Sequence, residues 1–500
     1  MSLAVVHSRA LVGMQAPEVR VEVHQGNGLP ALHIVGLPQA AVRESADRVR
    51  AALLQSGFEF PNRRLTVNLA PADLPKDSGR FDLPIAVGIL AASGQVPLEP
   101  LGELEFVGEL SLSGDIRPIR GALAMLLALR ASGCGRRLVV PAGCAAEAAL
   151  ACDGDAFSAG LLIEVCSHLR GNAVLARIDS RVPAANSAAA PSMRDVRGQA
   201  MAKRALEVAA AGGHSVLMVG PPGAGKTMLA QRFAGLLPPL DPHEALECAT
   251  VRSITGSFEP AQWGLRPLRS PHHTASGVAL VGGGGTPRPG EITLAHRGVL
   301  FLDELPEFDA RALEVLREPL ESGEITISRA ARQATFPASF QLIAAMNPCP
   351  CGQASNPRGG CSCSPERIAR YQRSISGPLL DRIDIRIHLD PVPLADLVQA
   401  PDQDDPRPRV AAALARQRER QCMPNAKLGV PDTERLCELS TEAAALLRQA
   451  PQRLGWSARG HHRALRVARS IADLAQSQRI EATHLAEALL YRKPLPAGVA

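Results

Sequence analysis

Aromatic residues are scarce in this sequence, with two Trp and two Tyr among 500 residues. Proteins that bind single strands by stacking bases on aromatic side chains carry more of them, so this mode of recognition is not favoured. A large excess of one charge is also lacking, because the formal net charge is only +5. Electrostatics alone therefore does not require a nucleic-acid partner.

Long apolar runs and a regular cysteine framework are missing too. No run approaches the ~18 apolar residues of a membrane-spanning helix, so no membrane partner is expected. The segment MSLAVVHSRALVGMQAPEVRVEV lacks the basic-then-apolar order of a secretion signal, and its spacing predicts two strands. The eleven Cys are odd in number and mostly scattered. Together these absences predict a chain of the reducing cytoplasm, without disulfides.

Sequence patterns change along the chain and predict three folded parts. Residues 1–168 alternate strand-like and helical patterns and form a first α+β domain. Residues 169–193 contain Pro, Ser and Ala without periodicity and are predicted as a linker. Residues 194–395 alternate strands with helices, as in a parallel α/β sheet, and residues 396–500 are almost entirely helical.

A phosphate-binding loop stands near the start of the second domain. The segment GPPGAGKT fits the G-x4-G-K-[ST] pattern, follows the apolar strand HSVLMVG and opens a helical pattern. Lys226 is expected to reach the β- and γ-phosphates of ATP, and the Thr227 hydroxyl to bind Mg²⁺. Backbone N–H groups of the loop surround the phosphates; its residues are Gly220, Pro221, Pro222, Gly223, Ala224, Gly225, Lys226 and Thr227.

Two further buried strands end in polar side chains. In GVLFLDEL, Asp303 is predicted to hold Mg²⁺ through water and Glu304 to polarise the attacking water. The strand FQLIAAMNP ends on Asn347, whose amide is predicted to orient that water. The alternatives are an acidic pair that caps the next helix and a turn residue before a proline. In this order, the three elements predict an AAA+ P-loop ATPase.

The segments SPHHTASGVALVGGGGTPRPGEITLAHRGVLFLDELPEF and ISGPLLDRIDI resemble the magnesium-chelatase-like branch of AAA+ proteins. With the N-terminal domain included, nearly the whole chain resembles the ComM/YifB-type family. The resemblance implies a hexameric ring that uses ATP to translocate on DNA and promotes branch migration during natural transformation. Its implied partners are single-stranded or branched DNA, further copies of the chain and recombination proteins.

The resemblance also assigns two arginines of the motor. Arg382 in LLDRIDI matches the family's arginine finger, which acts on the γ-phosphate bound by a neighbouring subunit. The alternative for Arg382 is an ion pair with Asp381 or Asp384. Arg466 matches the sensor-2 arginine of the helical lid, with Arg459 as the competing candidate.

Two inserts point to what the motor moves. The segment GEITISRAARQATFPASF alternates apolar and polar residues and predicts a β-hairpin with Arg329 and Arg332 at its tip. In related ring helicases such a hairpin points into the central channel, where arginines bind phosphates without reading sequence. The alternative is a solvated hairpin tip. The Gly-rich insert that holds His272 and His273 is predicted as a channel loop rather than a metal site.

The N-terminal domain resembles the Lon-protease-like (ribosomal S5 domain 2-like) α+β fold. Lon enzymes need a serine nucleophile after a Pro-Lys-Asp stretch and a lysine on the next helix. Here Arg80 stands where the serine is expected, and RGALAMLLALRASG contains no lysine. The domain is therefore predicted to be proteolytically inactive. Two interpretations stay open for Arg63, Arg64 and Arg80: they contact DNA, or they are solvated structural residues.

Four cysteines crowd into NPCPCGQASNPRGGCSCSP, namely Cys349, Cys351, Cys361 and Cys363. Two C-x-C pairs around a loop predict a tetrahedral Zn²⁺ site, and a group of free surface thiols is the alternative. ATP and Mg²⁺ are thus the expected ligands of the motor, with structural Zn²⁺ beside it. The rival functions are the ATPase subunit of a metal chelatase and a chaperone-like ring that remodels proteins.

Overall fold

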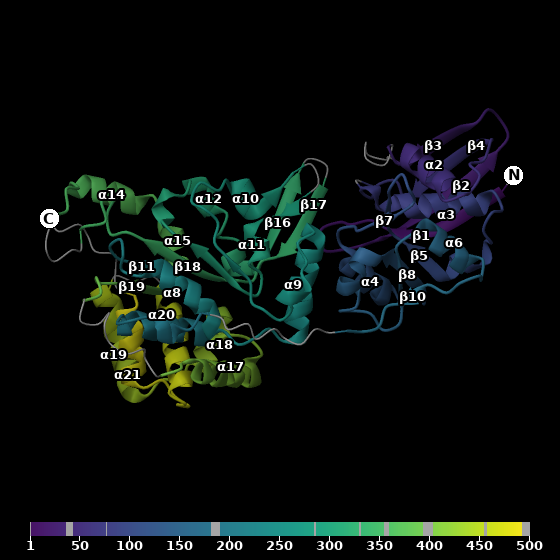
Figure 1. Cartoon of the computed structure of the whole chain (residues 1–500). Coiled ribbons are helices and arrows are strands. Elements are labelled where there is room, and N and C mark those ends of the chain that lie inside the picture. Colours follow the sequence, from purple (N-terminus) through teal and green to yellow (C-terminus); the bar gives the residue numbers. More distant parts are fainter. Residues whose placement is uncertain are drawn as a thin grey trace.

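The structure is a computed structural model that describes residues 2–36, 44–76, 78–181, 191–284, 287–329, 332–354, 360–393, 404–454 and 458–492. An N-terminal α+β domain is followed by a central α/β domain and a set of C-terminal helices (Figure 1). Among the helices in these ranges, none combines the length and the apolar character that a membrane crossing requires.

The N-terminal domain is built on an eight-stranded mixed sheet in the order β10-β9-β8-β5-β1-β2-β4-β3. The two strands predicted at the N-terminus are confirmed, and they pair antiparallel from Ser2↔Gln25 to Arg9↔Glu18. The sheet strands are β1 (Ser2–Arg9), β2 (Glu18–Gly26), β3 (Ala31–Val35), β4 (Arg64–Ala70), β5 (Leu104–Phe106), β8 (Arg137–Pro141), β9 (Ala156–Ala159) and β10 (Ala176–Arg177). A separate pair is formed by β6 (Glu109–Leu110) and β7 (Ile116–Arg117).

Helices cover this sheet, and the most buried of them is α3. All its residues are buried, because it contacts β1 and β2 along its length. Gly88 allows this approach, since a Cβ there would lie 2.6 Å from Cγ2 of Val23. The helices are α2 (Ser45–Gln55), α3 (Asp82–Ala92), α4 (Ala122–Ser132), α5 (Ala145–Ala148) and α6 (Leu162–Leu169).

The predicted linker 169–193 begins too early. Strand β10 lies inside this range and pairs antiparallel with β9, with Ala176 opposite Ser158. The Ile178 amide donates to the Ala156 carbonyl and extends the contact. Residues up to Ile178 therefore belong to the N-terminal sheet, and residues 182–190 of the predicted linker lie outside the described residues.

The central domain contains a parallel five-stranded sheet, as predicted, in the order β12-β15-β18-β11-β19. The middle strands are almost fully buried, because helices lie on both faces of a parallel sheet. The strands are β11 (Val216–Val219), β12 (Leu268–Arg269), β15 (Val299–Leu302), β18 (Gln341–Met346) and β19 (Ile385–His388). Their carboxyl ends meet at one edge, which brings the polar residues after β11, β15 and β18 together.

Helices and two hairpins surround this sheet. The helices are α7 (Ala200–Gly212), α8 (Lys226–Phe233), α9 (Pro242–Thr255), α10 (Gly277–Val281), α11 (Glu291–Leu294), α12 (Ala310–Glu314), α13 (Pro319–Ser322), α14 (Pro365–Arg373) and α15 (Gly377–Arg382). The Gly-rich insert forms α10 and the short pair β13 (Gly282–Gly283) and β14 (Arg288–Pro289). The predicted hairpin is confirmed as β16 (Glu324–Arg329) and β17 (Arg332–Pro337).

The C-terminal helices pack against the central domain. They are α17 (Arg407–Gln421), α18 (Val430–Leu436), α19 (Thr441–Leu454), α20 (Ala458–Leu474) and α21 (Ala482–Leu490). Helix α7 contacts both α17 and α20, and Leu206, Val410, Ala468 and Ile343 share one hydrophobic cluster. The C-terminal helices therefore share a hydrophobic cluster with the sheet that carries the loop after β11.

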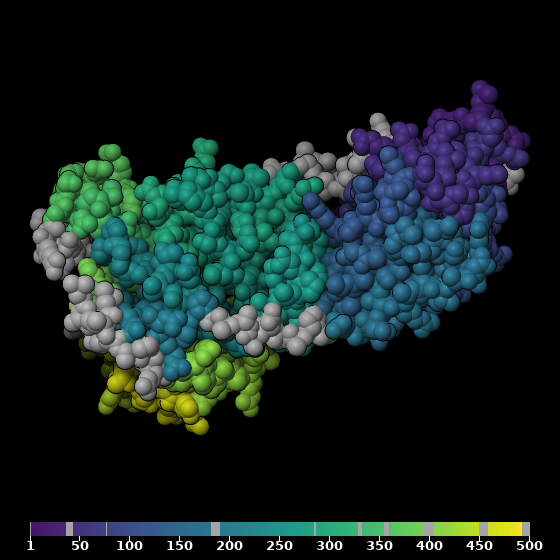
Figure 2. Space-filling model, in the orientation of Figure 1, coloured from purple at the N-terminus to yellow at the C-terminus, as the bar shows by residue number. Residues whose placement is uncertain are grey.

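The N-terminal and central domains also touch (Figure 2). Leu126 of α4 shares a hydrophobic cluster with Ala249 of α9 and with Trp263. The amides of Gly121 and Leu123 donate to the carbonyl and hydroxyl oxygens of Ser253, at 3.0 and 3.4 Å. The junction therefore combines apolar burial with hydrogen bonds.

Candidate functional site

The loop between β11 and α8 holds Lys226 at its centre. Gly223 and Gly225 have φ values of +79° and +90°, a backbone conformation that glycine adopts without strain. The Lys226 Nζ donates to the carbonyls of Gly220 (2.7 Å) and Pro221 (3.0 Å) and to Oδ1 of Asn347 (3.0 Å). Partial burial lowers the pKa of Lys226 from its ordinary value. The predicted loop and the predicted amide at the end of β18 thus meet.

The carboxylates after β15 face the same loop. The Thr227 hydroxyl donates to Oδ2 of Asp303 at 2.7 Å, and Oδ1 of Asp303 accepts from the Glu304 amide at 2.9 Å. Glu304 has a φ of +52°, so the chain turns sharply where its side chain leaves the strand. A hydroxyl beside a carboxylate is a set of hard oxygen donors that suits Mg²⁺. Both residues therefore fit the predicted metal ion.

His273 is a neighbour of Glu304 that the sequence interpretation missed. Its Nδ1 lies 3.2 Å from Oε2 of Glu304, and its ring lies 4.1 Å from that of His272, between centroids. Both histidines belong to the segment between β12 and α10. At the base of this insert, Arg269 binds both carboxylate oxygens of Glu291, at 2.7 and 2.8 Å. The insert that was predicted as a channel loop thus reaches the edge of the sheet where Asp303 and Glu304 lie.

Arg382 ends α15 and lies largely buried, with 8% of its surface exposed. Its Nη2 lies 2.7 Å from Oε1 of Glu321, and its Nη1 donates to the Pro378 carbonyl at 2.8 Å. The predicted alternative partner Asp384 instead binds Arg463 at 2.6 Å, and among the described residues no ion pair joins Arg382 to Asp381. The guanidinium borders a hollow of about 540 Å³ that Glu314, Glu318 and Glu321 also line.

Arg466 on α20 contacts the C-terminal helices rather than the phosphate-binding loop. Its Nε donates to the Thr433 hydroxyl at 3.1 Å and its Nη1 to the Ala426 carbonyl at 3.3 Å. Arg459, the competing candidate, is exposed near the start of the same helix. On α20, Arg463 contacts the central domain, because its Nη1 donates to the Arg382 carbonyl at 2.8 Å. The sensor-2 assignment of Arg466 stays a prediction.

The hairpin places Arg329 and Arg332 at its end, as predicted, because these two residues form its last cross-strand pair. Their side chains lie outside the described residues. The middle of the hairpin borders the insert, since a Cβ on Gly282 would lie 3.0 Å from Cδ1 of Ile327, which pairs with Ala334. The two elements therefore pack together.

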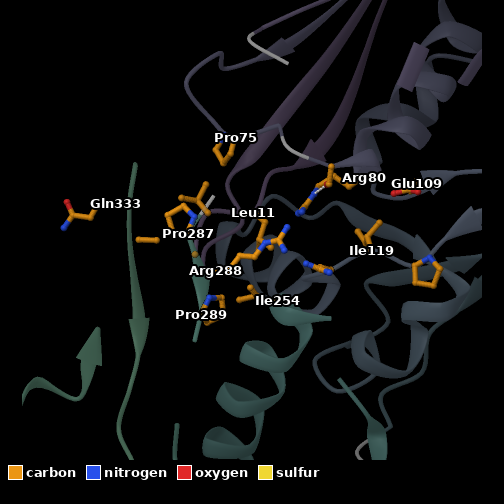
Figure 3. A pocket seen from close by; sticks show the side chains of 16 residues that line it. Leu11, Pro75, Arg80, Glu109, Ile119, Ile254, Pro287, Arg288, Pro289 and Gln333 are labelled. Atoms are coloured by element: carbon orange, nitrogen blue, oxygen red, sulfur yellow. Dashed lines mark hydrogen bonds between the residues drawn. The ribbon is translucent and has the colours of Figure 1, made fainter. Parts of the chain in front are cut away.

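A cavity of about 300 Å³ lies where the hairpin, the insert and the N-terminal domain meet. Figure 3 shows it, with Leu11 and Arg80 from the N-terminal domain and Ile254, Arg288 and Gln333 from the central domain. The N-terminal domain thus also reaches this hairpin.

Arg80 is 5% exposed, and its Nε donates to the Ser78 hydroxyl at 2.6 Å. This burial corrects the idea that Arg80 is offered to DNA at an open surface and favours the structural alternative. Arg63 and Arg64 are exposed. The likeness of this domain to the Lon fold stays a prediction.

The four predicted cysteines come together beside Asn347. Their sulfur atoms all lie within 4.8 Å of one another, and none of the four is in a disulfide. The pKa of the Cys351 thiol is lowered to about 6, first by a hydrogen bond from the Gln353 amide and then by one from Cys349. The structure thus favours the metal-site interpretation over a group of separated surface thiols.

Three family models match successive parts of the chain. "Subunit ChlI of Mg-chelatase" matches residues 21–143, "Magnesium chelatase, subunit ChlI" matches residues 192–397, and "Magnesium chelatase, subunit ChlI C-terminal" matches residues 403–492. "Uncharacterized protein YifB" of Salmonella typhimurium is 47% identical over 503 residues, covering 98% of this chain and 97% of its own. "Competence protein ComM" of Haemophilus influenzae is 47% identical over 501 residues, 98% of either chain.

The chain belongs to the ComM/YifB family of magnesium-chelatase-like AAA+ proteins. The family predicted from the sequence is thereby confirmed, and with it an ATP site of the AAA+ type. The "Magnesium-chelatase 38 kDa subunit" of Cereibacter sphaeroides is 29% identical over 169 residues, which is 30% of this chain and 51% of that subunit. Similarity to the ComM/YifB family therefore extends over parts of the chain that this chelatase match does not cover.

Proposed function

We propose that the chain forms a hexameric, ATP-driven DNA translocase, a helicase that promotes branch migration during homologous recombination in natural transformation. One observation carries the proposal: Lys226, Thr227, Asp303, Glu304 and Asn347 meet at one edge of the sheet, in the domain that also carries the hairpin. The near full-length similarity to a competence protein supports the recombination setting. The proposed ligands are ATP and Mg²⁺ at this edge and Zn²⁺ at the four cysteines.

Each residue at the edge has a role in hydrolysis. Glu304 accepts a proton from the attacking water while Asn347 orients that water. The water oxygen bonds to the γ-phosphorus while the bond from that phosphorus to the β–γ bridging oxygen breaks, so that ADP and inorganic phosphate leave. Lys226 and the Arg382 of a neighbouring subunit offset the charge on the phosphate oxygens. Thr227 and Asp303 would hold Mg²⁺, which would supply further charge neutralisation when bound.

The hairpin is the proposed DNA-binding element. Arg329 and Arg332 lie at the end that projects farthest from its base, where guanidinium groups bind phosphates of any sequence. Scarce aromatic residues agree with contacts to the DNA backbone rather than to stacked bases. Because the hairpin packs on the insert that carries His273, movement of DNA and the state of Glu304 have a physical connection.

The decisive experiment uses a labelled three-strand DNA junction. The native chain is expected to displace the labelled strand with ATP, and Lys226→Ala to displace none. DNA should raise ATP turnover, whereas a chelatase subunit would respond to its partner subunit and a protein-remodelling ring to unfolded polypeptide. A turnover rate that DNA leaves unchanged, without strand displacement, would contradict the proposal.

Replacing both hairpin arginines tests the DNA contact separately. Arg329→Ala with Arg332→Ala is expected to weaken DNA binding and to reduce the slope of log affinity against log salt by about 1.4, the value for two phosphate contacts on single strands. The matched control is Arg435→Ala, since Arg435 is exposed and paired with Asp432 on a C-terminal helix. If Arg435→Ala weakened DNA binding as much as the double hairpin variant does, the proposal that the hairpin binds DNA would be contradicted.

His273 gives a prediction for the chemical step. His273→Ala is expected to lower kcat about tenfold and to leave the KM for ATP unchanged, because Glu304 loses the contact that orients it. His273→Asn should restore turnover, since its amide nitrogen replaces Nδ1. His272→Ala is the control, because the Nδ1 of His272 contacts Thr274 rather than Glu304. Equal losses from His272→Ala and His273→Ala would show a general effect on the loop.

A further inference from the structure

The cysteine cluster has the dimensions of a metal site. The Sγ atom of Cys349 lies 3.3 Å from that of Cys351 and 3.8 Å from that of Cys361, and the last two are 3.6 Å apart. Four thiolates bound to zinc at ~2.3 Å stand about 3.8 Å apart, whereas sulfurs in a disulfide are ~2.05 Å apart. Cys349 is buried and Cys361 is exposed, so the site is anchored on one side and open to an entering ion on the other.

The first pair of cysteines, Cys349 and Cys351, stands in a turn that lies against the phosphate-binding loop. Gly352, which directly follows Cys351, has a φ of +78°, and a Cβ there would lie 2.5 Å from Cδ of Pro222. The same Cβ would lie 3.9 Å from Cγ of Asn347. The turn is closed by the Gly352 amide, which donates to the Cys349 carbonyl at 2.9 Å. Position 352 therefore fits against both the phosphate-binding loop and the amide that contacts Lys226.

The second pair of cysteines leads into the segment that carries Arg382. Helix α14 begins at Pro365, two residues after Cys363, and the Ser364 hydroxyl caps it by accepting from the Arg367 amide. Near the end of α14, Nε2 of Gln372 donates to the Pro348 carbonyl at 3.3 Å. This hydrogen bond connects α14 to the residue directly before Cys349. The four cysteines therefore connect the segment that follows Asn347 to α14, the helix that precedes α15.

We infer that a zinc ion on these four thiolates clamps the turn at Gly352 against Pro222, so that metal loading sets how tightly the phosphate-binding loop holds ATP. A metal bridge between two chain segments removes much of the conformational freedom of the turn. The inference rests on the proposed ATP site, and it assigns the metal a role outside the chemistry of hydrolysis.

The first experiment measures metal and ATP together in the full-length protein. The purified chain is expected to contain about one zinc per subunit and the Cys361→Ser, Cys363→Ser double variant less than about a quarter. In the folded double variant, the dissociation constant for ATP should rise about tenfold. Zinc below about a quarter equivalent in the native protein, or equal ATP affinity with and without zinc, would overturn the inference.

A pair of glycine variants separates the clamp from the metal. Gly352→Ala keeps all four cysteines but forces a Cβ toward Pro222, so we expect native zinc content and about tenfold weaker ATP binding. Gly360→Ala has a comparable backbone strain, with a φ of +103°, yet its Cβ would meet no atom of the described part of the chain within 4 Å. Equal ATP affinities of these two variants would overturn the clamp. Absence of ATP binding by the native chain would instead contradict the proposed function.

Discussion

The Glu304→Gln variant is expected to bind ATP as tightly as the native chain and to hydrolyse it at least about 10²-fold more slowly. The amide has the shape of the carboxylate but cannot accept the proton of the attacking water. Glu304 directly follows Asp303, yet only Asp303 contacts Thr227, so the metal-binding pair is left intact. Turnover of ATP under saturating conditions, with binding measured separately, checks this result.

Lys226→Ala is the matched control for this experiment. Lys226 joins the loop carbonyls to Asn347, and its ammonium group is the proposed partner of the ATP phosphates, so this variant should lose ATP binding as well as turnover. Loss of ATP binding in Lys226→Ala, against loss of hydrolysis alone in Glu304→Gln, would distinguish the phosphate-binding residue from the proton acceptor. A Glu304→Gln variant that retains more than about a tenth of the native turnover would show that another group accepts the proton.

Much of this site was predictable because its residues occupy strand ends. Apolar strands before Gly220, Asp303 and Asn347 indicated neighbours in a parallel sheet, and parallel strands place their carboxyl ends at one edge. The hairpin was predictable for a similar reason, since alternation of apolar and polar residues has the period of a strand. The two C-x-C pairs predicted the cysteine group by their spacing alone.

Contacts between distant segments were not predictable in this way. His273 reaches Glu304 only because β12 lies beside β15, and a two-residue strand such as β12 or β10 leaves no periodic pattern. Arg382 has two acidic neighbours in sequence, but its partner Glu321 comes from α13. Opposite charges that are adjacent in sequence are therefore a poor guide to which carboxylate an arginine binds, because the fold decides the distance.

The second large effect is expected at Arg382. Arg382→Ala should lower ATP turnover by about 10³-fold if the guanidinium acts on the γ-phosphate of a neighbouring subunit. Glu321→Ala removes the present partner of Arg382 and is the matched control. An equal loss in Glu321→Ala would show that the ion pair itself supports the fold. Nearly native turnover in Glu321→Ala would assign the loss to the guanidinium.

Mixing two inactive variants tests whether Arg382 acts between subunits. A Lys226→Ala subunit lacks the phosphate-binding lysine but keeps Arg382, whereas an Arg382→Ala subunit has the opposite defect. In a ring of head-to-tail contacts, an equal mixture restores complete sites at about a quarter of the interfaces. Turnover of the mixture should therefore rise well above that of either variant alone. If Arg382 served only its own chain, no mixture would contain a complete site, and turnover would stay at the level of the separate variants.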